Sequence, residues 1–133
     1  MTKTIQQSEK FNALPEALYE LYMDSEKHSA ATGMPAKLGR KVGSGFTAFG
    51  GMLEGRTLML VPGKMIVQAW RSSSWKKSDE DSILVLTFRK SGSGSRIELA
   101  HVNVPEHDHK GVTKGWKKFY WKPWRKYLKT LGK

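Results

Sequence analysis

The sequence predicts an α+β domain in which a long C-terminal helix covers the concave face of a curved antiparallel sheet. Turn-forming residues divide 36–105 into runs of strand length, and large apolar residues recur at every second position within these runs. From Val112 onward the apolar residues recur instead at intervals of three and four, as on one face of a helix. A length of 133 residues suits one core, so we expect residues 1–133 to form a single domain of the order β-α-α-β(meander)-α.

The N-terminal part predicts one strand followed by two short helices. Residues 5–11 form the strand, and Pro15 is a favourable first residue for a helix over 15–23. Asp24 or Ser25 can cap a second helix that extends to Ala31, and Gly33 followed by Pro35 ends it.

The central part predicts an antiparallel meander. Pro62-Gly63 suits the two central positions of a type II turn, because Pro presets the first φ and Gly tolerates the positive second one. Alternation sorts side chains onto two faces. We assign the larger and more apolar set to the concave face; it consists of Ile66, Gln68, Trp70, Leu84, Leu86, Phe88, Ile97, Leu99, His101 and Asn103.

The C-terminal segment predicts a long amphipathic helix with an aromatic inner face. The predicted inner residues are Val112, Trp116, Phe119, Tyr120, Pro123, Trp124, Tyr127, Leu128 and Leu131. Lysines and Arg125 fall on the opposite side. Trp121 falls at the edge of the apolar stripe, and an exposed Trp there would mark a contact surface or a ligand portal. Pro123 has no backbone N–H, so a kink is expected beside it.

A curved sheet and one helix do not close along their whole length, which predicts a cleft between them. Its expected lining is Phe46, Gln68, Trp70, Leu86, Phe88, Leu99, His101, Asn103, Trp116, Phe119, Tyr120 and Trp124. Gln68, His101 and Asn103 are the polar members that could orient a ligand. The competing interpretation is that these side chains simply fill the core and satisfy one another.

Composition excludes several classes of protein. No cysteine is present, so disulfides, thiolate metal sites and a cysteine nucleophile are excluded. The polar N-terminus and the absence of a long apolar run predict a cytoplasmic protein without a signal peptide or membrane span. The formal net charge is +11, and nine of the 23 Lys and Arg residues fall in 110–133, where there is no acid. That excess could attract an acidic partner or could simply be a solvated face.

The chain resembles the START-like, birch-pollen-allergen-like (SRPBCC) superfamily, and within it the homologues of the C-terminal domain of the activator of the heat-shock-protein-90 ATPase. The most specific residues are the run Ile66-Val67-x-x-Trp70-Arg71 and the later Gly115-Trp116-x-x-x-Tyr120. The resemblance also uses 46–51, Gly55, 60–65, Trp75, 86–88, Val104-Pro105 and Trp121, in order along nearly the whole chain. It implies the helix-grip (START-like) fold and a hydrophobic cavity beneath the C-terminal helix.

Three functions follow as hypotheses. The first is a non-enzymatic module that binds a small hydrophobic or amphipathic ligand in that cavity. The second, from the resemblance, is a chaperone-regulating or protein-interaction domain; in the eukaryotic activator a separate N-terminal domain makes much of the chaperone contact, and 133 residues leave no room for it. The third is a cyclase-like enzyme that uses His101 as acid or base near Tyr120.

Other partners and cofactors are disfavoured by the sequence. We predict no catalytic residues, no cofactor and no metal, because His107 and His109 in a polar loop, with His101, form only a loose ligand set. Nucleic-acid binding is disfavoured, since the aromatic residues lie on the apolar stripe and not among the lysines, where bases would stack.

Overall fold

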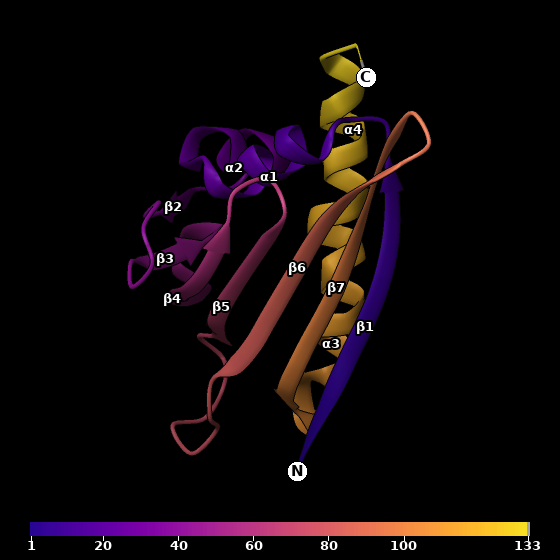
Figure 1. Ribbon diagram of the computed structural model, residues 1–133. Helices are drawn as coiled ribbons and strands as arrows, with labels where there is room; N and C mark the ends of the chain where they lie inside the picture. Colours follow the sequence, from indigo (N-terminus) through magenta and orange to yellow (C-terminus); the bar gives the residue numbers. More distant parts are fainter. Residues whose placement is uncertain (133) are drawn as a thin grey trace.

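The computed structural model describes residues 1–132 as a seven-stranded antiparallel sheet with helices on its concave face (Figure 1). In space the strands run β1-β7-β6-β5-β4-β3-β2, so the first strand pairs with the last. The strands are β1 (Thr2–Phe11), β2 (Ala36–Leu38), β3 (Gly45–Ala48), β4 (Leu53–Val61), β5 (Met65–Ser72), β6 (Ser82–Ser91) and β7 (Gly94–Pro105). The helices are α1 (Pro15–Met23), α2 (Ser25–Thr32), α3 (His109–Gly115) and α4 (Lys122–Thr130), with the 3-10 turns η1 (Phe49–Gly51) and η2 (Glu106–Asp108) and the π-helical segment η3 (Trp116–Trp121). The predicted α+β class is confirmed.

The two N-terminal helices begin and end where their capping residues predict. Pro15 stands at the first position of α1. The Asp24 side chain accepts a hydrogen bond from the Lys27 N–H and so caps α2, and Gly33 ends α2 with a φ of 78°. The Pro62-Gly63 turn is also confirmed, because Gly63 has a φ of 75° and the Lys64 N–H donates to the Val61 carbonyl over 2.8 Å.

A β-bulge near the end of β7 overturns one prediction. Pairing between β1 and β7 shifts between Lys3 and Ile5, and Asn103 takes a φ of 63°. Because a bulge inserts one extra residue, the alternation of faces changes by one beyond it. Val104 is therefore fully buried. The predicted inward orientation of Asn103 is wrong: its side chain donates to the Asp81 carbonyl at the surface.

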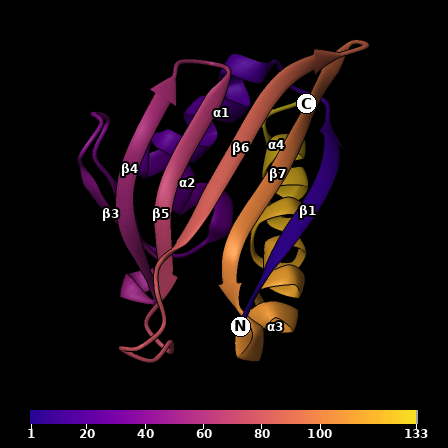
Figure 2. The same cartoon turned by 60° about the horizontal axis from the view of Figure 1, so that its bottom comes forward.

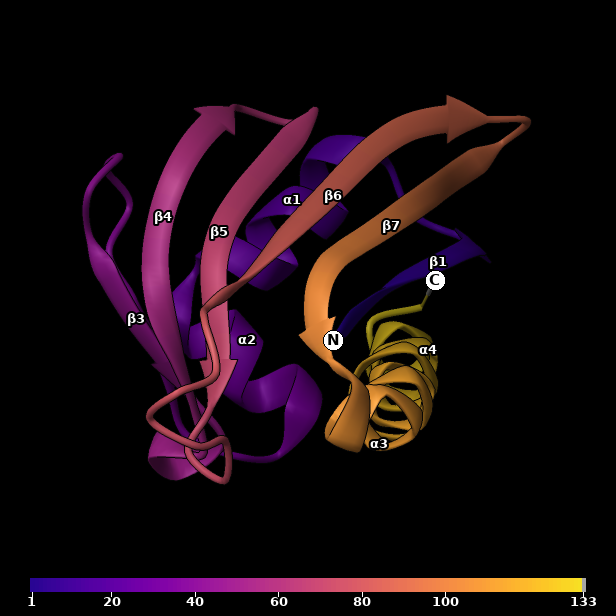
Figure 3. The same cartoon turned by 90° about the horizontal axis from the view of Figure 1, so that it is seen from below.

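The segments α3, η3 and α4 form one continuous helix that lies in the hollow of the curved sheet (Figure 3). The turned view in Figure 2 shows this helix running alongside β7 and β1, while α1 and α2 occupy the concave face nearer β5 and β6. The sheet thus wraps around α1, α2 and the C-terminal helix, and not around the C-terminal helix alone.

The middle of this helix is a π-helix. The Lys122 N–H donates to the carbonyl of Lys117, five residues earlier, in place of the usual four. Pro123 follows directly and offers no N–H. A π-turn adds one residue to the turn and so rotates everything after it on the helix surface. The side chains buried against the sheet are consequently Val112, Trp116, Tyr120, Trp121, Trp124 and Leu128.

One prediction about the helix faces is wrong for that reason: Phe119, expected inside, is 47% exposed, while Trp121, placed at the edge of the stripe, is only 1% exposed. The predicted inward orientation of Leu131 is also wrong, because α4 ends at Thr130 and Leu131, just beyond it, is 55% exposed. Among residues 1–132, no helix is both long and apolar enough to cross a bilayer.

Candidate functional site

Between the sheet and the helix, where the cleft was predicted, aromatic rings of the protein pack on one another. Ten of the twelve expected lining residues are buried, and the exceptions are Asn103 and Phe119. Trp116 packs on Trp70 at a centroid distance of 6.3 Å and on Tyr120 at 4.7 Å, and Tyr120 lies 6.0 Å from Trp124. Phe88 is brought under α1, where its ring lies 5.8 Å from that of Tyr19. The structure thus packs most of the predicted set into one core.

His101 lies in this interior between the sheet and the helix, with both ring nitrogens in use. The Trp116 indole N–H donates to Nδ1 over 3.1 Å, which makes Nδ1 an acceptor and places the proton on Nε2. Nε2 therefore donates to Ser82 Oγ at 2.8 Å, and the Ser82 hydroxyl donates to the Trp70 carbonyl. Burial lowers the pKa of His101 to about 3.

Gln68 belongs to a second chain of buried hydrogen bonds. The Tyr22 hydroxyl donates to Gln68 Oε1 over 2.8 Å, and the Gln68 amide donates to Thr57. Burial raises the pKa of the Tyr22 hydroxyl. Gln68 is thus held by neighbouring side chains, as the core-filling interpretation expects.

His28 and Tyr120 form the third polar contact in the interior. His28 Nδ1 donates to the Tyr22 carbonyl, so its Nε2 accepts from the Tyr120 hydroxyl at 2.9 Å. Burial lowers the pKa of His28 to about 4 and raises that of Tyr120. The Tyr120 hydroxyl is therefore paired with His28, and among the described residues no hydrogen bond joins it to His101.

These arrangements do not activate a nucleophile. In a serine–histidine pair the imidazole must accept the hydroxyl proton, whereas here Nε2 of His101 already carries a proton and the Ser82 hydroxyl points to a carbonyl. Elsewhere, His107 binds Asp79 and Asp108 accepts from the Trp75 indole. Over the described part of the chain, no three His, Cys, Asp or Glu side chains come together as metal ligands would.

Sequence reasoning missed several interior residues. Trp75 packs on Trp70 at 5.6 Å although it comes from the loop after β5, where no periodicity applies. His28 and Ala31 are the buried residues of α2, an otherwise polar helix. Their spacing of three was the one available signal, and it was too short to identify a buried face.

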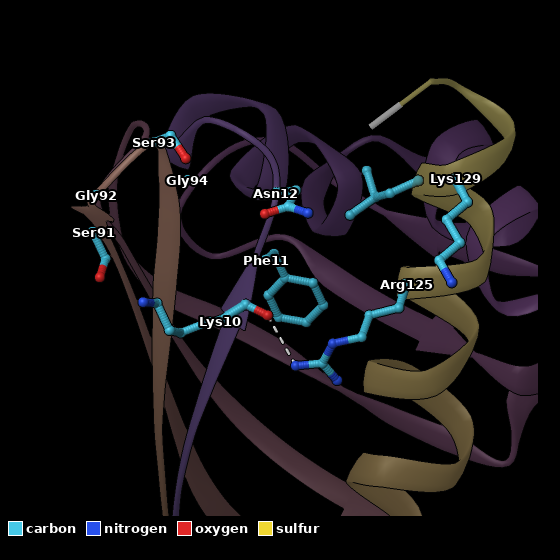
Figure 4. Close-up of a pocket in the computed structure, with 10 residues that line it drawn as sticks. Lys10, Phe11, Asn12, Ser91, Gly92, Ser93, Gly94, Arg125 and Lys129 are labelled. Carbon is cyan, nitrogen blue, oxygen red and sulfur yellow. Dashed lines mark hydrogen bonds between the residues drawn. The ribbon is translucent and has the colours of Figure 1, made fainter.

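Two hollows of the described structure lie away from this interior. One, of about 410 Å³, lies on the outer face of β1, β6 and β7. The other, of about 350 Å³, lies where the end of β1, the β6–β7 hairpin and the last turns of α4 meet (Figure 4). Ligand binding beneath the helix remains a prediction.

Phe49, Met52 and Phe119 form an apolar patch in which Met52 and Phe119 are exposed and Phe49 is partly buried against the core. The rings of Phe49 and Phe119 are 5.7 Å apart, edge to face. Met52 is 60% exposed, and its N–H donates to the Phe49 carbonyl. We call these three residues the Phe49–Phe119 patch.

Both halves of this patch depend on an irregular backbone. Phe49 has a φ of 53°, a left-handed conformation that is costly for a residue with a Cβ, and the next two residues are glycines with φ of 66° and 96°. Phe119 is turned outward by the π-helix. Backbone irregularities of these two kinds occur frequently at functional sites.

The patch is bordered by positive charge. Lys118 Nζ lies 5.3 Å from the centroid of the Phe119 ring, and Lys122, four residues further along the helix, is exposed. Between 110 and 132 the chain has no acidic residue to neutralise these lysines.

Comparison with known proteins identifies one matching family and several curated relatives. A family described as "Activator of Hsp90 ATPase homolog 1-like protein" matches residues 12–129. An activator of 90 kDa heat shock protein ATPase homolog from Dictyostelium discoideum is 29% identical over 118 residues, which are 88% of this chain and 30% of that protein. The human homolog 1 is 30% identical over 112 residues, 84% of this chain and 33% of that protein. The chain therefore spans about a third of the length of these curated relatives.

Solved structures agree on the fold. An Hsp90 activator from Plasmodium falciparum superposes with a TM-score of 0.84 at 21% identity, covering 94% of this chain and 95% of that one. The solution structure of an Aha1 dimer from Colwellia psychrerythraea gives 0.75 at 16% identity, covering 90% and 92%. At these identities the likeness concerns the fold alone.

Proposed function

The chain belongs to the family of activator of Hsp90 ATPase homolog 1-like proteins, whose pattern covers residues 12–129, and from that membership we propose that it binds a chaperone ATPase of the 90 kDa heat-shock class and stimulates it. The observation that carries this proposal is the Phe49–Phe119 patch. A protein-binding domain needs an exposed apolar anchor, and this patch offers one.

The patch has the features of a binding hot spot. Aromatic side chains that already pack on one another lose little conformational freedom when a partner covers them. Phe49 is fixed by its contact with Tyr120, at a ring distance of 5.4 Å, as well as by Phe119. The site is therefore formed before the partner arrives.

The lysines beside the patch indicate the chemistry of the partner surface. Lys118 and Lys122 are exposed, and no acid lies near them in sequence. A complementary surface would present an apolar side chain flanked by carboxylates. We propose that the chaperone supplies such a surface.

The proposal is tested by measuring the steady-state ATPase rate of the heat-shock-protein-90 chaperone from the same organism with increasing amounts of the purified chain. Stimulation by the natural chain is expected. Phe119→Ala and Met52→Ala should each weaken binding at least about tenfold, the effect of losing a hot-spot side chain. Failure of the natural chain to bind or stimulate the chaperone would contradict the proposal.

Met59→Ala is the matched control for Met52→Ala. Met59 is 52% exposed and Met52 is 60% exposed, but Met59 lies in β4, outside the patch. It should leave binding and stimulation unchanged. Equal losses in the two methionine variants would show that the patch is not the contact surface.

A small hydrophobic ligand held between sheet and helix is the second candidate function. It is favoured by two buried indole N–H groups, those of Trp70 and Trp124, which have no hydrogen-bond acceptor among the described residues. An unpaired buried donor is costly, and a ligand acceptor would remove that cost. Native mass spectrometry of the purified protein should then show an added mass that is released on denaturation. The bare protein mass would count against this candidate.

A further inference from the structure

The hollow of about 350 Å³ at the end of α4 has the construction of an anion site. Figure 4 shows that three separate parts of the chain form it: the end of β1, the β6–β7 hairpin and the last turns of α4. Its volume falls within the range of small-molecule sites. The lining residues are Lys10, Phe11, Asn12, Ser91, Gly92, Ser93, Gly94, Arg125, Leu128 and Lys129.

All the charged residues that line the hollow are cationic. Lys10, Arg125 and Lys129 are cationic, and none of the ten lining residues is acidic. The carboxylate of Glu9 is paired with Arg125 over 2.7 Å. The hollow therefore keeps an excess of positive charge after this pairing is counted, and it favours an anion.

Arg125 is held ready in one orientation. Its Nη2 donates to Glu9 Oε1 and to the Lys10 carbonyl, over 2.7 and 2.9 Å, and its guanidinium carbon lies 4.6 Å from the centroid of the Phe11 ring. Within residues 1–132 these are the only hydrogen bonds of the guanidinium, so Nε and Nη1 are left for a ligand. A planar guanidinium with two free donors matches the spacing of phosphate oxygens.

The β6–β7 hairpin forms the wall opposite Arg125, and close backbone packing holds it against the end of β1. A Cβ at Gly94 would lie 2.2 Å from the Phe11 carbonyl oxygen, so the hairpin is pressed directly against the end of β1. The Ser95 hydroxyl donates to the Ala13 carbonyl and ties the same two segments together. Figure 4 shows the Ser93 hydroxyl and the Asn12 amide on this side of the hollow. Both are neutral groups able to donate to an anion.

From this construction we propose that the hollow binds the phosphate group of a small phosphorylated molecule. Arg125 supplies the fork, Lys10 and Lys129 supply point charges, and Phe11 and Leu128 supply an apolar wall for the body of the ligand. The hollow is larger than a bare oxyanion needs, which favours a phosphate ester over free phosphate. This site is separate from the Phe49–Phe119 patch, and neither proposal depends on the other.

The test is a titration of the isotope-labelled chain with phenyl phosphate, with inorganic phosphate and uncharged benzyl alcohol in parallel, followed by amide NMR. Saturable shifts centred on Asn12, Gly92, Ser93 and Gly94 are expected at about 1 mM phenyl phosphate, with weaker effects of inorganic phosphate and none of benzyl alcohol. The absence of saturable shifts at these amides with either phosphate would overturn the proposal.

Two double variants distinguish a specific phosphate site from non-specific electrostatic attraction to the cationic surface. Lys10→Gln with Lys129→Gln should weaken phenyl phosphate binding about tenfold, because two phosphate contacts are lost. Lys110→Gln with Lys114→Gln removes the same charge from exposed positions on α3 and should change binding less than about twofold. Equal weakening by both pairs would show only non-specific attraction and would refute the site. A thermal melt of each variant checks that it is folded.

Discussion

Trp116 and Phe119 are three residues apart on the C-terminal helix but lie in different surroundings. Trp116 is 2% exposed and contacts Trp70, His101 and Tyr120, whereas Phe119 is 47% exposed. Trp116→Ala should lower the free energy of unfolding by about 3–5 kcal/mol, since it leaves a cavity and an unpaired acceptor on His101. Phe119→Ala should lower it by less than about 1.5 kcal/mol.

Urea denaturation of the two variants at pH 7 measures this difference. Similar losses for both would mean that the outer side of η3 is buried after all. Because Phe119 belongs to the proposed contact surface, a small loss of stability also keeps its effect on chaperone binding interpretable.

The buried histidines make the stability depend on pH. Burial lowers the pKa of His28 to about 4 and that of His101 to about 3, against a value near 6.5 in an unfolded chain. At a pH between the folded and unfolded pKa values, these histidines bind protons in the unfolded state but not in the folded state. The free energy of unfolding is therefore highest above pH 6.5 and should fall by up to about 2 kcal/mol per histidine by pH 5.

Denaturation curves between pH 7.5 and about pH 5 check this slope, and NMR checks its cause. The ring signals of His28 and His101 should show no protonation over that range. A midpoint near pH 6.5 for either ring would contradict the assigned neutral state.

At single residues, the sequence could predict burial only where the backbone stays regular. Trp70, Leu86 and His101 lie inside because alternation holds along β5, β6 and most of β7. Asn103 does not lie inside, because the bulge in β7 adds one residue to the repeat of the strand. Phe119 does not lie inside, because the π-turn adds one residue to the repeat of the helix. Neither irregularity leaves a local sequence signal as firm as Gly63 leaves for its turn.

At the scale of the element, the π-helix behaves as an insertion of one residue, and this can be tested by deletion. Without Lys118, an exposed residue, the buried set Trp116, Tyr120, Trp121, Trp124 and Leu128 would follow the intervals of a regular α-helix. The deletion variant should therefore fold, with a cooperative melt and the same aromatic circular-dichroism bands.

Deleting Lys126 is the matched control. It removes an equally exposed lysine from α4, where the helix is already regular, and so turns Leu128 by about 100° away from the core. This variant should lose several kcal/mol of stability. If the Lys118 deletion were at least as damaging, the π-turn would not be a simple insertion.

The elements themselves were largely predictable because their ends carry specific chemistry. Pro15, Asp24 and Gly33 determine where α1 and α2 begin and end, and Gly63 determines the β4–β5 hairpin. The contact of β1 with β7 has no such signal, since pairing of the first and last strands depends on the closure of the whole sheet. The hollow beside Arg125 depends on that closure, which is why no local pattern indicated it.

For the molecule as a whole, the polar side chains on the inward faces form hydrogen bonds with one another. Gln68, His101 and Tyr120 could have oriented a ligand, but each is engaged by a neighbour in the core. The sequence could not reveal this, because a polar residue on an inward face is equally compatible with a cavity and with an internal network.

Charge and apolar contact should affect different steps of the proposed chaperone binding. Lys118 and Lys122 act at a distance, so changing both to Gln should slow association several-fold at low salt and have little effect at about 0.5 M salt, where the field is screened. Phe119 acts only in contact, so Phe119→Ala should speed dissociation at either salt and leave association nearly unchanged. Surface plasmon resonance against the immobilised chaperone separates the two rates. A lysine effect confined to dissociation, or a Phe119 effect confined to association, would mean that the partner is recognised at some other surface of the domain.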